Sequence, residues 1–437
     1  MESLGYSEAK TKDEADVILV NTCTVRGSAQ NKAIGYIASL KGLKIQNPND
    51  KCQINDKIQM TNEKTIGVCG CLAQQEKEEL LKKYPFVDFV LGPGSLHELE
   101  KVLGKGYKVN GTLIETCNPE LRNLPQKRKP STVAYVSIMY GCDNFCSFCI
   151  VPYVRGREVS RPKEDILREI KELDRSVFKE VVLLGQNVNS YRNPKSEILN
   201  PKQIQMTEIR NSKQNTDYSL DQLLEDASRI DGIERIKFLT SHPRDMSDDI
   251  IRAVKELPKV CEYFHLPLQS GDDEVLKAMN RGYTLHYYSD LVDRIRKAIP
   301  DAAITSDIIV GFPGETEKQF KNTLKAIKDI GFDTVNTLSY SDRPGTAASK
   351  MEGKISEKVK KERLKELMAV VEVTALKKNK ELVGKTVEIL VDSPNTGRTR
   401  GNKIVKFKGD EKLIGKLVRV AIIKAKSFIM EGRQPSP

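Results

Sequence analysis

The segment "YGCDNFCSFCIVPYVRGREVSRP", Tyr140–Pro162, places Cys142, Cys146 and Cys149 within eight residues. It directly follows the apolar run Ala134–Met139, which has the length and composition of a buried strand. In barrels of alternating strands and helices, the functional groups lie on loops after the strands. Iron–sulfur cubes take thiolate ligands, and a cube held by three thiolates leaves one iron open for a further ligand. The segment therefore predicts a three-thiol 4Fe-4S site on a loop after the first barrel strand.

The apolar run before this loop is the first of six runs separated by helical patterns. This repeat predicts an open, partial (β/α)6 barrel over residues 133–368, interrupted by a polar insertion at 191–218. The six predicted strands are Ala134–Met139, Glu180–Leu184, Arg235–Thr240, Tyr263–Leu268, Ala303–Val310 and Thr334–Tyr340.

The N-terminal residues 1–116 also alternate between strand and helix patterns. Strands are predicted at Ala15–Cys23, Thr65–Cys71 and Val87–Pro93, and helices at Ser28–Leu40 and Gln74–Lys83. This pattern favours a small doubly wound α/β domain, with a polar surface insertion at 42–64. A linker rich in Pro and basic residues, 117–132, connects it to the barrel.

The C-terminal part begins with a charged helix, Glu357–Lys380, whose residues 369–380 connect the barrel to the last domain. That domain, residues 381–437, holds short β-rich runs, which predict a small antiparallel β-barrel of a kind that often binds nucleic acids. These residues include twelve Lys or Arg against six Asp or Glu, so a polyanion-binding surface is expected. A solvated basic face without a partner is the alternative.

Composition argues against membrane-spanning, secreted and disulfide-rich proteins. The 437 residues carry a formal net charge of +11. No run approaches the roughly 18 apolar residues of a membrane span, and the N-terminus is neither a secretory signal nor a transit peptide, so a cytoplasmic protein is expected. Nine irregularly spaced cysteines favour metal or redox chemistry over a disulfide framework. Zinc is the alternative metal, but it requires a fourth ligand and the cysteine loop contains no histidine.

Together with other motifs, the cysteine loop resembles that of the radical-SAM superfamily, and specifically of its MiaB-type methylthiotransferases. The similarity extends over nearly the whole chain and rests on an ordered set of motifs. After the cysteine loop these are "LLGQNVNSY" (183–191), "TSHPRD" (240–245), "HLPLQSG" (265–271), "MNRGYT" (279–284), "SDIIVGFPGET" (306–316) and "YSDRPGTAA" (340–348).

The resemblance implies that the open iron of the cluster binds S-adenosylmethionine (SAM) and that one electron cleaves it to a 5′-deoxyadenosyl radical. It also implies three groups of SAM contacts. The amino group is expected at Gly185, Gln186 and Asn187, the ribose at Gln269 and Ser270, and the adenine at Ile309, Gly311 and Phe312. Arg155 and Arg343 are loop arginines, for which an anionic group of SAM or RNA is a fair partner and a surface role an alternative.

In this family the N-terminal domain holds a second 4Fe-4S cluster through three cysteines. Cys23 in "NTCTVR" and Cys71 in "GCLAQ" match two of them, whereas no cysteine precedes Cys23. We expect either a truncated chain or a start assigned at an internal methionine. Cys52 in "KCQIND" is an alternative third ligand, although it lies inside the polar insertion. The other three cysteines are interpreted as ordinary buried residues: Cys69, Cys117 and Cys261.

The C-terminal segment resembles the TRAM domain, a small β-barrel associated with RNA. Basic side chains on it are expected to contact phosphates, which confers affinity without base selectivity: Arg398, Arg400, Lys403 and Lys406. The target base is then read in the barrel, and an unstacked base in an anticodon loop is the expected substrate.

The resulting hypothesis is a tRNA methylthiotransferase that acts on carbon 2 of an isopentenylated adenosine beside the anticodon, with a flavodoxin or ferredoxin system as electron donor. One alternative is the sister enzyme that modifies an aspartate of a small-subunit ribosomal protein. A second is a non-catalytic iron–sulfur RNA-binding protein or inactive fragment, and a zinc-dependent RNA-binding module is more remote.

Overall fold

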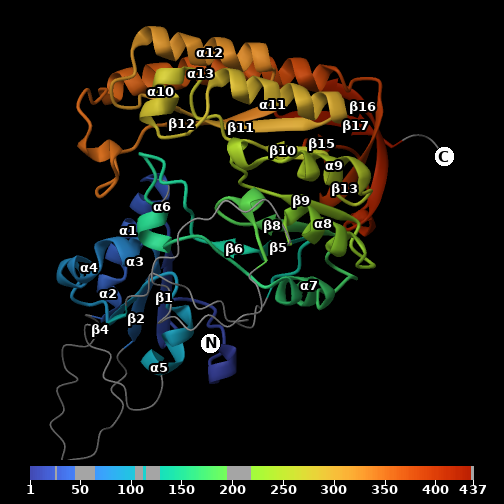
Figure 1. Ribbon diagram of the computed structural model, residues 1–437. Helices are drawn as coiled ribbons and strands as arrows, with labels where there is room; N and C mark the ends of the chain where they lie inside the picture. Colours follow the sequence, from blue (N-terminus) through green and yellow to red (C-terminus); the bar gives the residue numbers. More distant parts are fainter. Residues whose placement is uncertain (25–26, 45–63, 104–111, 115–127, 194–217, 435–437) are drawn as a thin grey trace, which may run out of the picture. The chain divides into compact units, whose positions relative to one another are not determined.

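The computed structural model describes residues 1–24, 27–44, 64–103, 112–114, 128–193 and 218–434 (Figure 1). The chain forms two compact units. The first comprises residues 1–125, 141–157 and 343–346, so the cysteine loop and a short segment near Arg343 belong to it. The second comprises residues 126–140, 158–342 and 347–437.

The described part of the first unit contains a parallel sheet of four strands in chain order. The strands are β1 (Val17–Thr22), β2 (Thr65–Gly70), β3 (Phe89–Leu91) and β4 (Thr112–Ile114). The helices are α1 (Gly27–Ser39), α2 (Lys41–Lys44), α3 (Cys71–Glu76), α4 (Glu78–Lys83), α5 (Leu99–Leu103) and α6 (Val151–Arg155), with 3₁₀ turns η1 (Glu2–Leu4) and η2 (Leu96–Glu98).

Helices cover both faces of this sheet, as predicted for a doubly wound domain. Ile37 of α1 and Leu72 of α3 pack with Ile18 and Val68 on one face, whereas Val102 of α5 packs with Phe89 on the other. Two details differ from the prediction. The strand β4 was not expected, and the helix expected at Gln74–Lys83 is two helices, since Lys77 adopts a left-handed φ of 48° between α3 and α4.

The second unit contains all six predicted barrel strands, arranged as two parallel three-stranded sheets. One is formed by β5 (Val133–Ser137), β8 (Glu180–Leu184) and β9 (Arg235–Phe238), and the other by β10 (Tyr263–His265), β11 (Ala303–Val310) and β12 (Thr334–Ser339). A parallel bridge between Ile236 and Val260 links β9 to the segment before β10. In sequence, the antiparallel pair β6 (Met139–Tyr140) and β7 (Val159–Ser160) flanks the cysteine loop.

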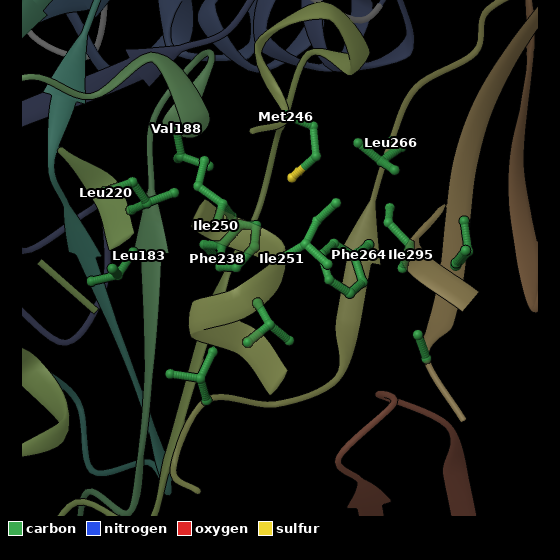
Figure 2. Packing of buried hydrophobic residues seen from close by; sticks show 14 of the residues in the cluster. Leu183, Val188, Leu220, Phe238, Met246, Ile250, Ile251, Phe264, Leu266 and Ile295 are labelled. Atoms are coloured by element: carbon green, nitrogen blue, oxygen red, sulfur yellow. The ribbon is translucent and has the colours of Figure 1, made fainter. Parts of the chain in front are cut away.

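Helices pack on one side of these strands and enclose a single large apolar core. Alternate strand residues such as Leu183, Phe238 and Phe264 contact helix residues such as Ile250 and Ile295 (Figure 2). The helices are α7 (Lys163–Lys171), α8 (Leu220–Ser228), α9 (Asp248–Glu256), α10 (Asp273–Ala278), α11 (Leu285–Ala298), α12 (Glu317–Ile330) and α13 (Glu357–Lys380), and the 3₁₀ turns are η3 (Val188–Ser190), η5 (Pro243–Asp245) and η6 (Ala348–Lys350).

The C-terminal residues of the second unit form a closed five-stranded barrel with the order β13-β14-β15-β17-β16. The strands are β13 (Thr386–Ser393), β14 (Thr396–Thr399), β15 (Ile404–Lys406), β16 (Leu417–Ala425) and β17 (Ile429–Arg433), with a 3₁₀ turn η7 (Glu411–Leu413). The prediction of a wholly antiparallel barrel is wrong at one pairing, because β15 and β17 run parallel where the barrel closes.

Several predicted segments lie largely or wholly outside the described residues. These are the insertions at 42–64 and 191–218, the linker 117–132, and the cysteines Cys52 and Cys117. None of the helices in the described parts of the chain is long and apolar enough to span a membrane.

Candidate functional site

The cysteine loop is closed at its neck by backbone contacts. Gly141 has a left-handed φ of 67°, and a Cβ atom added there would lie 2.0 Å from the carbonyl oxygen of Arg157. One residue further on, the N–H of Cys142 donates to the carbonyl of Gly156 at 3.3 Å. Only glycine fits position 141 without moving the opposite strand of the neck, so this residue sets where the loop begins and ends.

Within the loop the three cysteines are close in sequence and shielded from water. Cys142 and Cys146 are buried, and Cys149 is half-buried. The N–H of Cys149 donates to the carbonyl of Cys146 at 2.9 Å, which forms a tight turn between these two residues. Asn144 Nδ2 donates to the sulfur of Cys142 at 3.6 Å. The donor set is three thiols, and it fits a 4Fe-4S cluster with one open iron.

No three His, Cys, Asp or Glu side chains in the described ranges are gathered closely enough to hold a single metal ion. A 4Fe-4S cluster does not require such a group, because each thiolate binds a different iron and the sulfurs lie further apart than around one ion.

Two further cysteines lie at the same edge of the N-terminal sheet. Strands β1 and β2 are parallel, with Thr22 beside Gly70, so Cys23 and Cys71 follow the ends of neighbouring strands. Gly70 adopts a φ of 97°, and an added Cβ would lie 2.3 Å from the carbonyl oxygen of Thr22. The backbone therefore turns sharply after β2 and places Cys71 at the start of α3, with 2% of its surface exposed.

An arginine from the cysteine loop meets one of these thiols. Arg155 Nε donates to the sulfur of Cys71 at 3.3 Å, and the apolar side chains of Ile150 and Val154 pack against the same residue. Arg155 was predicted to meet an anionic group of SAM or RNA, but its described partner is a cysteine sulfur of the same unit.

A polar cluster surrounds the residue next to Cys23. The buried hydroxyl of Thr24 donates to the side-chain oxygens of Gln30, at 3.1 Å, and Gln75. Arg343 donates to the same oxygen of Gln30. The second loop arginine therefore also contacts residues of the N-terminal domain, a partner that the sequence separation of 313 positions concealed.

The remaining described cysteines have apolar surroundings. Cys69 packs with Phe89 and Val102, and Cys261 packs with Tyr263 and Ala303. Burial raises the pKa of both thiols to about 11, so neither is a ready thiolate at neutral pH. This environment agrees with their interpretation as structural residues.

The predicted amino-group contacts of SAM lie after β8. A Cβ atom added to Gly185 would lie 2.3 Å from Met139 Cγ, so only glycine fits there. Gln186 is half-buried. Asn187 is buried, donates through Nδ2 to Asp245 at 2.7 Å and accepts the N–H of His242 through Oδ1 at 3.0 Å. Its side chain therefore fixes the loop after β9.

His242 belongs to this network as a neutral group. Burial, together with the guanidinium groups of Arg281 and Arg244, lowers the pKa of His242 to about 2. Its Nδ1 accepts the N–H of Arg244 at 3.3 Å. At neutral pH the ring therefore acts as a hydrogen-bond acceptor that shapes the loop, and it carries no proton to transfer.

Gln269 has the environment expected of a ligand contact. Its φ is 73°, which non-glycine residues rarely adopt, and backbone hydrogen bonds to Asp307 and Ile309 hold it there, each at 2.9 Å. Its side-chain Oε1 is buried and has no hydrogen-bond partner among the described residues. A buried acceptor without a partner is costly, so a strained residue that presents one is a candidate for binding a donor group.

The other predicted SAM contacts are buried or already hydrogen-bonded within the protein. The hydroxyl of Ser270 is fully buried and lies 3.3 Å from that of Thr323 in α12. Near β11, Ile309 is buried and the N–H of Gly311 donates to Glu315 at 2.7 Å. The ring of Phe312 is buried with its centroid 5.6 Å from that of Tyr340.

Sequence reasoning missed a polar row on the strands of the second sheet. His265 Nε2 lies 3.4 Å from Asp307 Oδ1, its Nδ1 lies 3.0 Å from the hydroxyl of Thr305, and Asn336 donates to Asp307 at 2.8 Å. Their neighbours Phe264, Ile304 and Val335 face the helices. The signal was present, because polar residues alternate with apolar ones along β10 to β12.

The C-terminal basic residues divide into two pairs. Arg400 donates to Glu262 at 2.7 Å and to the carbonyl of Val260, and Lys403 pairs with Asp333 at 2.7 Å. These contacts attach the C-terminal barrel to the central strands and neutralise both charges. Arg398 pairs with Asp392 within its own barrel and remains 41% exposed, and Lys406 is exposed.

Comparisons with known proteins match all three parts of the chain. Residues 136–327 match the Radical SAM superfamily, residues 370–433 match the TRAM domain, and residues 1–92 match a family described as Uncharacterized protein family UPF0004. Among solved structures, the radical S-adenosylmethionine methyltransferase TsrM from Kitasatospora setae, with cobalamin and a 4Fe-4S cluster bound, is similar with a TM-score of 0.50 and 14% identity. The match covers 76% of this chain and 65% of TsrM and shows the fold alone.

Two curated relatives are similar over almost their whole length. The tRNA-2-methylthio-N(6)-dimethylallyladenosine synthase of Clostridium perfringens (strain SM101) is 43% identical over 448 residues, which covers 99% of this chain and 92% of that protein. The synthase of Carboxydothermus hydrogenoformans is 43% identical over 444 residues, covering 99% and 93%.

The fold and the cysteine loop define a radical-SAM protein with an appended TRAM domain. Within that class, the chain belongs to the family of tRNA-2-methylthio-N(6)-dimethylallyladenosine synthases, as the motifs in its sequence indicated. Membership of the radical-SAM superfamily implies the use of SAM and a 4Fe-4S cluster.

Proposed function

We propose that this chain places a methylthio group on carbon 2 of an isopentenylated adenosine beside the anticodon of tRNA. The observation that carries the proposal is the 43% identity to synthases named for this product, over nearly the full length of both proteins. The TRAM domain and the three-cysteine loop agree with it, because one suits an RNA substrate and the other radical chemistry.

Cys142, Cys146 and Cys149 are proposed to hold the SAM-binding cluster, since their thiols are the donor set that such a cluster takes. When bound, the cluster supplies the electron that cleaves SAM. The protein contributes a loop closed at its neck, in which Cys142 and Cys146 are buried and Cys149 is half-buried. A flavodoxin or ferredoxin system is the proposed electron donor, and the cytoplasm, where tRNA is modified, is the proposed compartment.

Cys23 and Cys71 are proposed as ligands of a second 4Fe-4S cluster. They follow neighbouring strands at one sheet edge, as two ligands of one cluster would. The described residues supply two thiols there, one fewer than the three that the family pattern has, so no reaction step is derived from this second site.

Of the proposed SAM contacts, Gln269 has the strongest structural support. Replacement of Gln269 by Leu removes the buried acceptor Oε1 with little change in size. We expect the KM for SAM to rise about tenfold, the effect of one lost hydrogen bond of ordinary strength, with a smaller change in kcat. Steady-state SAM cleavage by the reconstituted protein measures both constants.

Ser270→Ala is the matched control, because the hydroxyl of Ser270 is fully buried, lies 3.3 Å from that of Thr323 and accepts the N–H of Asp272 at 3.3 Å. It is expected to leave the KM for SAM within about twofold of the original, since both of these neutral contacts are made within the protein. Equal KM values for Gln269→Leu and the unmodified protein would remove Gln269 from the SAM site.

For RNA binding we propose Arg398 and Lys406 as phosphate contacts. Arg400 and Lys403 have less structural support for this role. Arg398 is partly exposed and Lys406 exposed, whereas Arg400 and Lys403 already neutralise Glu262 and Asp333. Contacts to phosphate give affinity that falls with salt concentration and is independent of base sequence.

The proposed function is tested by nucleoside analysis of tRNA. Isopentenylated tRNA is incubated anaerobically with the reconstituted full chain, SAM and a reductant, then digested and examined by mass spectrometry. We expect the mass of the 2-methylthio nucleoside in place of its isopentenylated precursor. SAM cleavage without this product, or modification of a ribosomal-protein aspartate instead, would contradict the proposal.

A further inference from the structure

The loop that carries Cys142, Cys146 and Cys149 is attached to the N-terminal domain by its outgoing end. Helix α6 begins directly after Ile150, and Ile150 and Val154 pack against Cys71, which is 2% exposed. The Nε–H of Arg155, the last residue of α6, donates to the sulfur of Cys71 at 3.3 Å. Two apolar side chains and one charged donor therefore join the loop to Cys71, the first residue of α3.

The contact with Arg155 has the properties of a strong restraint. A guanidinium is always charged and presents its donors in a rigid plane, so it fixes direction as well as distance. The charge of the donor strengthens the hydrogen bond and offsets in part the weak acceptor character of a cysteine sulfur. The sulfur of Cys71 is buried and loses the donor that Arg155 supplies when the arginine is removed.

A second arginine makes a further contact within the same unit. Arg343 is buried and donates to Gln30, which also accepts from Thr24, the residue after Cys23. In the segment that Arg343 begins, Gly345 lies close to the loop, since a Cβ added there would be 3.8 Å from Ile150 Cδ1. Ile150 therefore lies close to Cys71 and Gly345, two residues of the first unit that are far apart in sequence.

We propose that Arg155 is a positioning residue that fixes the three-cysteine loop to Cys71. The N-terminal domain then sets the geometry of the SAM-cluster ligands in addition to holding Cys23 and Cys71. Functional groups must be held within about 0.5 Å of their working positions, and a loop released at one end loses that precision. The inference rests on one part of the proposed function, the assignment of the three loop cysteines as cluster ligands.

The test is amide hydrogen exchange of the full chain, measured in iron-free protein so that the outcome does not depend on cluster assembly. Arg155→Met keeps an unbranched apolar chain as far as the position of Nε and removes the guanidinium with its donors. We expect exchange across residues 142–156 to accelerate about tenfold, because one charge-assisted hydrogen bond is lost. Arg155→Lys keeps a charged donor without the rigid plane and is expected to restore part of the protection.

Arg157→Met is the matched control on the same loop. The Arg157 side chain is 70% exposed, pairs with Asp143 at 3.0 Å and lies over the ring of Phe145, so its contacts stay within the loop. We expect exchange to change less than about twofold, since exposed ion pairs contribute little. Equal acceleration in Arg157→Met and Arg155→Met would overturn the proposal, because the effect would then be general.

A double variant separates the Arg155–Cys71 contact from misfolding. If the two side chains act through each other, Arg155→Met in a Cys71→Ala background adds little to the acceleration that Cys71→Ala causes. Additive effects would overturn the proposal. In reconstituted protein, the electron paramagnetic resonance spectrum of the reduced SAM cluster is expected to broaden in Arg155→Met and to recover in part in Arg155→Lys. Nucleoside analysis of tRNA tests the proposed function independently of these results.

Discussion

Replacement of Cys142, Cys146 or Cys149 by Ala is expected to reduce SAM cleavage by more than about a hundredfold, beyond the loss typical of a residue that only supports a ligand. Each thiol is one of three in the loop, and none of the four histidines in the sequence lies between residues 140 and 162 to replace it. A cluster with two remaining ligands is lost or binds SAM in the wrong geometry. The measurement is 5′-deoxyadenosine formed per chain after anaerobic reconstitution, together with iron content.

The matched control is Cys261→Ala. Cys261 is a buried thiol with a pKa raised to about 11 by burial, and it packs with Tyr263 and Ala303 away from the loop. The Cys261→Ala variant is expected to cleave SAM normally. This result would show that the loss of cleavage in the loop variants is not a general effect of removing a cysteine. tRNA binding should persist in the loop variants, because the proposed phosphate contacts are on the TRAM domain. Undiminished cleavage by a loop variant would refute the cluster assignment.

Much of the fold was predictable because its signals are local. The strands β8 and β11 and the helix α13 have the predicted boundaries, since each strand is a short segment rich in β-branched and other apolar residues and the helix is a charged segment with a clear cap. In α13, Ser356 accepts the N–H of Val359, which marks the start of the helix. The position of the cysteine loop after the first barrel strands was equally local, because it follows from spacing alone.

What could not be predicted depends on residues distant in sequence. Arg400 was predicted to contact RNA, and its ion pair with Glu262, 138 positions away, was not foreseen. Arg155 is paired with Cys71 across 84 positions, and no periodicity reveals that contact. The parallel pairing of β15 with β17 is likewise set by how the barrel closes. Local patterns specify elements and motifs, whereas the partners of charged side chains are fixed only by tertiary structure.

A second large effect is expected inside the central domain, at the ion pair of Glu180 in β8 and Lys237 in β9. The Lys237 Nζ lies 3.0 Å from Glu180 Oε2, and the side chains of Lys237 and Glu180 are only 2% and 5% exposed, respectively. Glu180→Ala leaves the ammonium buried with the amide oxygen of Asn402 at 3.4 Å as its other described acceptor. We expect a loss of about 3–5 kcal/mol in the free energy of unfolding, as for other buried pairs with one partner removed.

The reason for this loss is that a buried charge without its partner cannot regain its hydration, and this is tested by removing both charges. Glu180→Leu combined with Lys237→Met replaces the pair by apolar groups of similar size, and it is expected to recover most of the stability that Glu180→Ala loses. Asp329→Ala is the control, since its pair with Lys325 is exposed and should contribute little. Chemical denaturation, followed by a probe in the central domain, measures all three variants. If the double variant is as unstable as Glu180→Ala, the unpaired charge of Lys237 is not the cause of the loss.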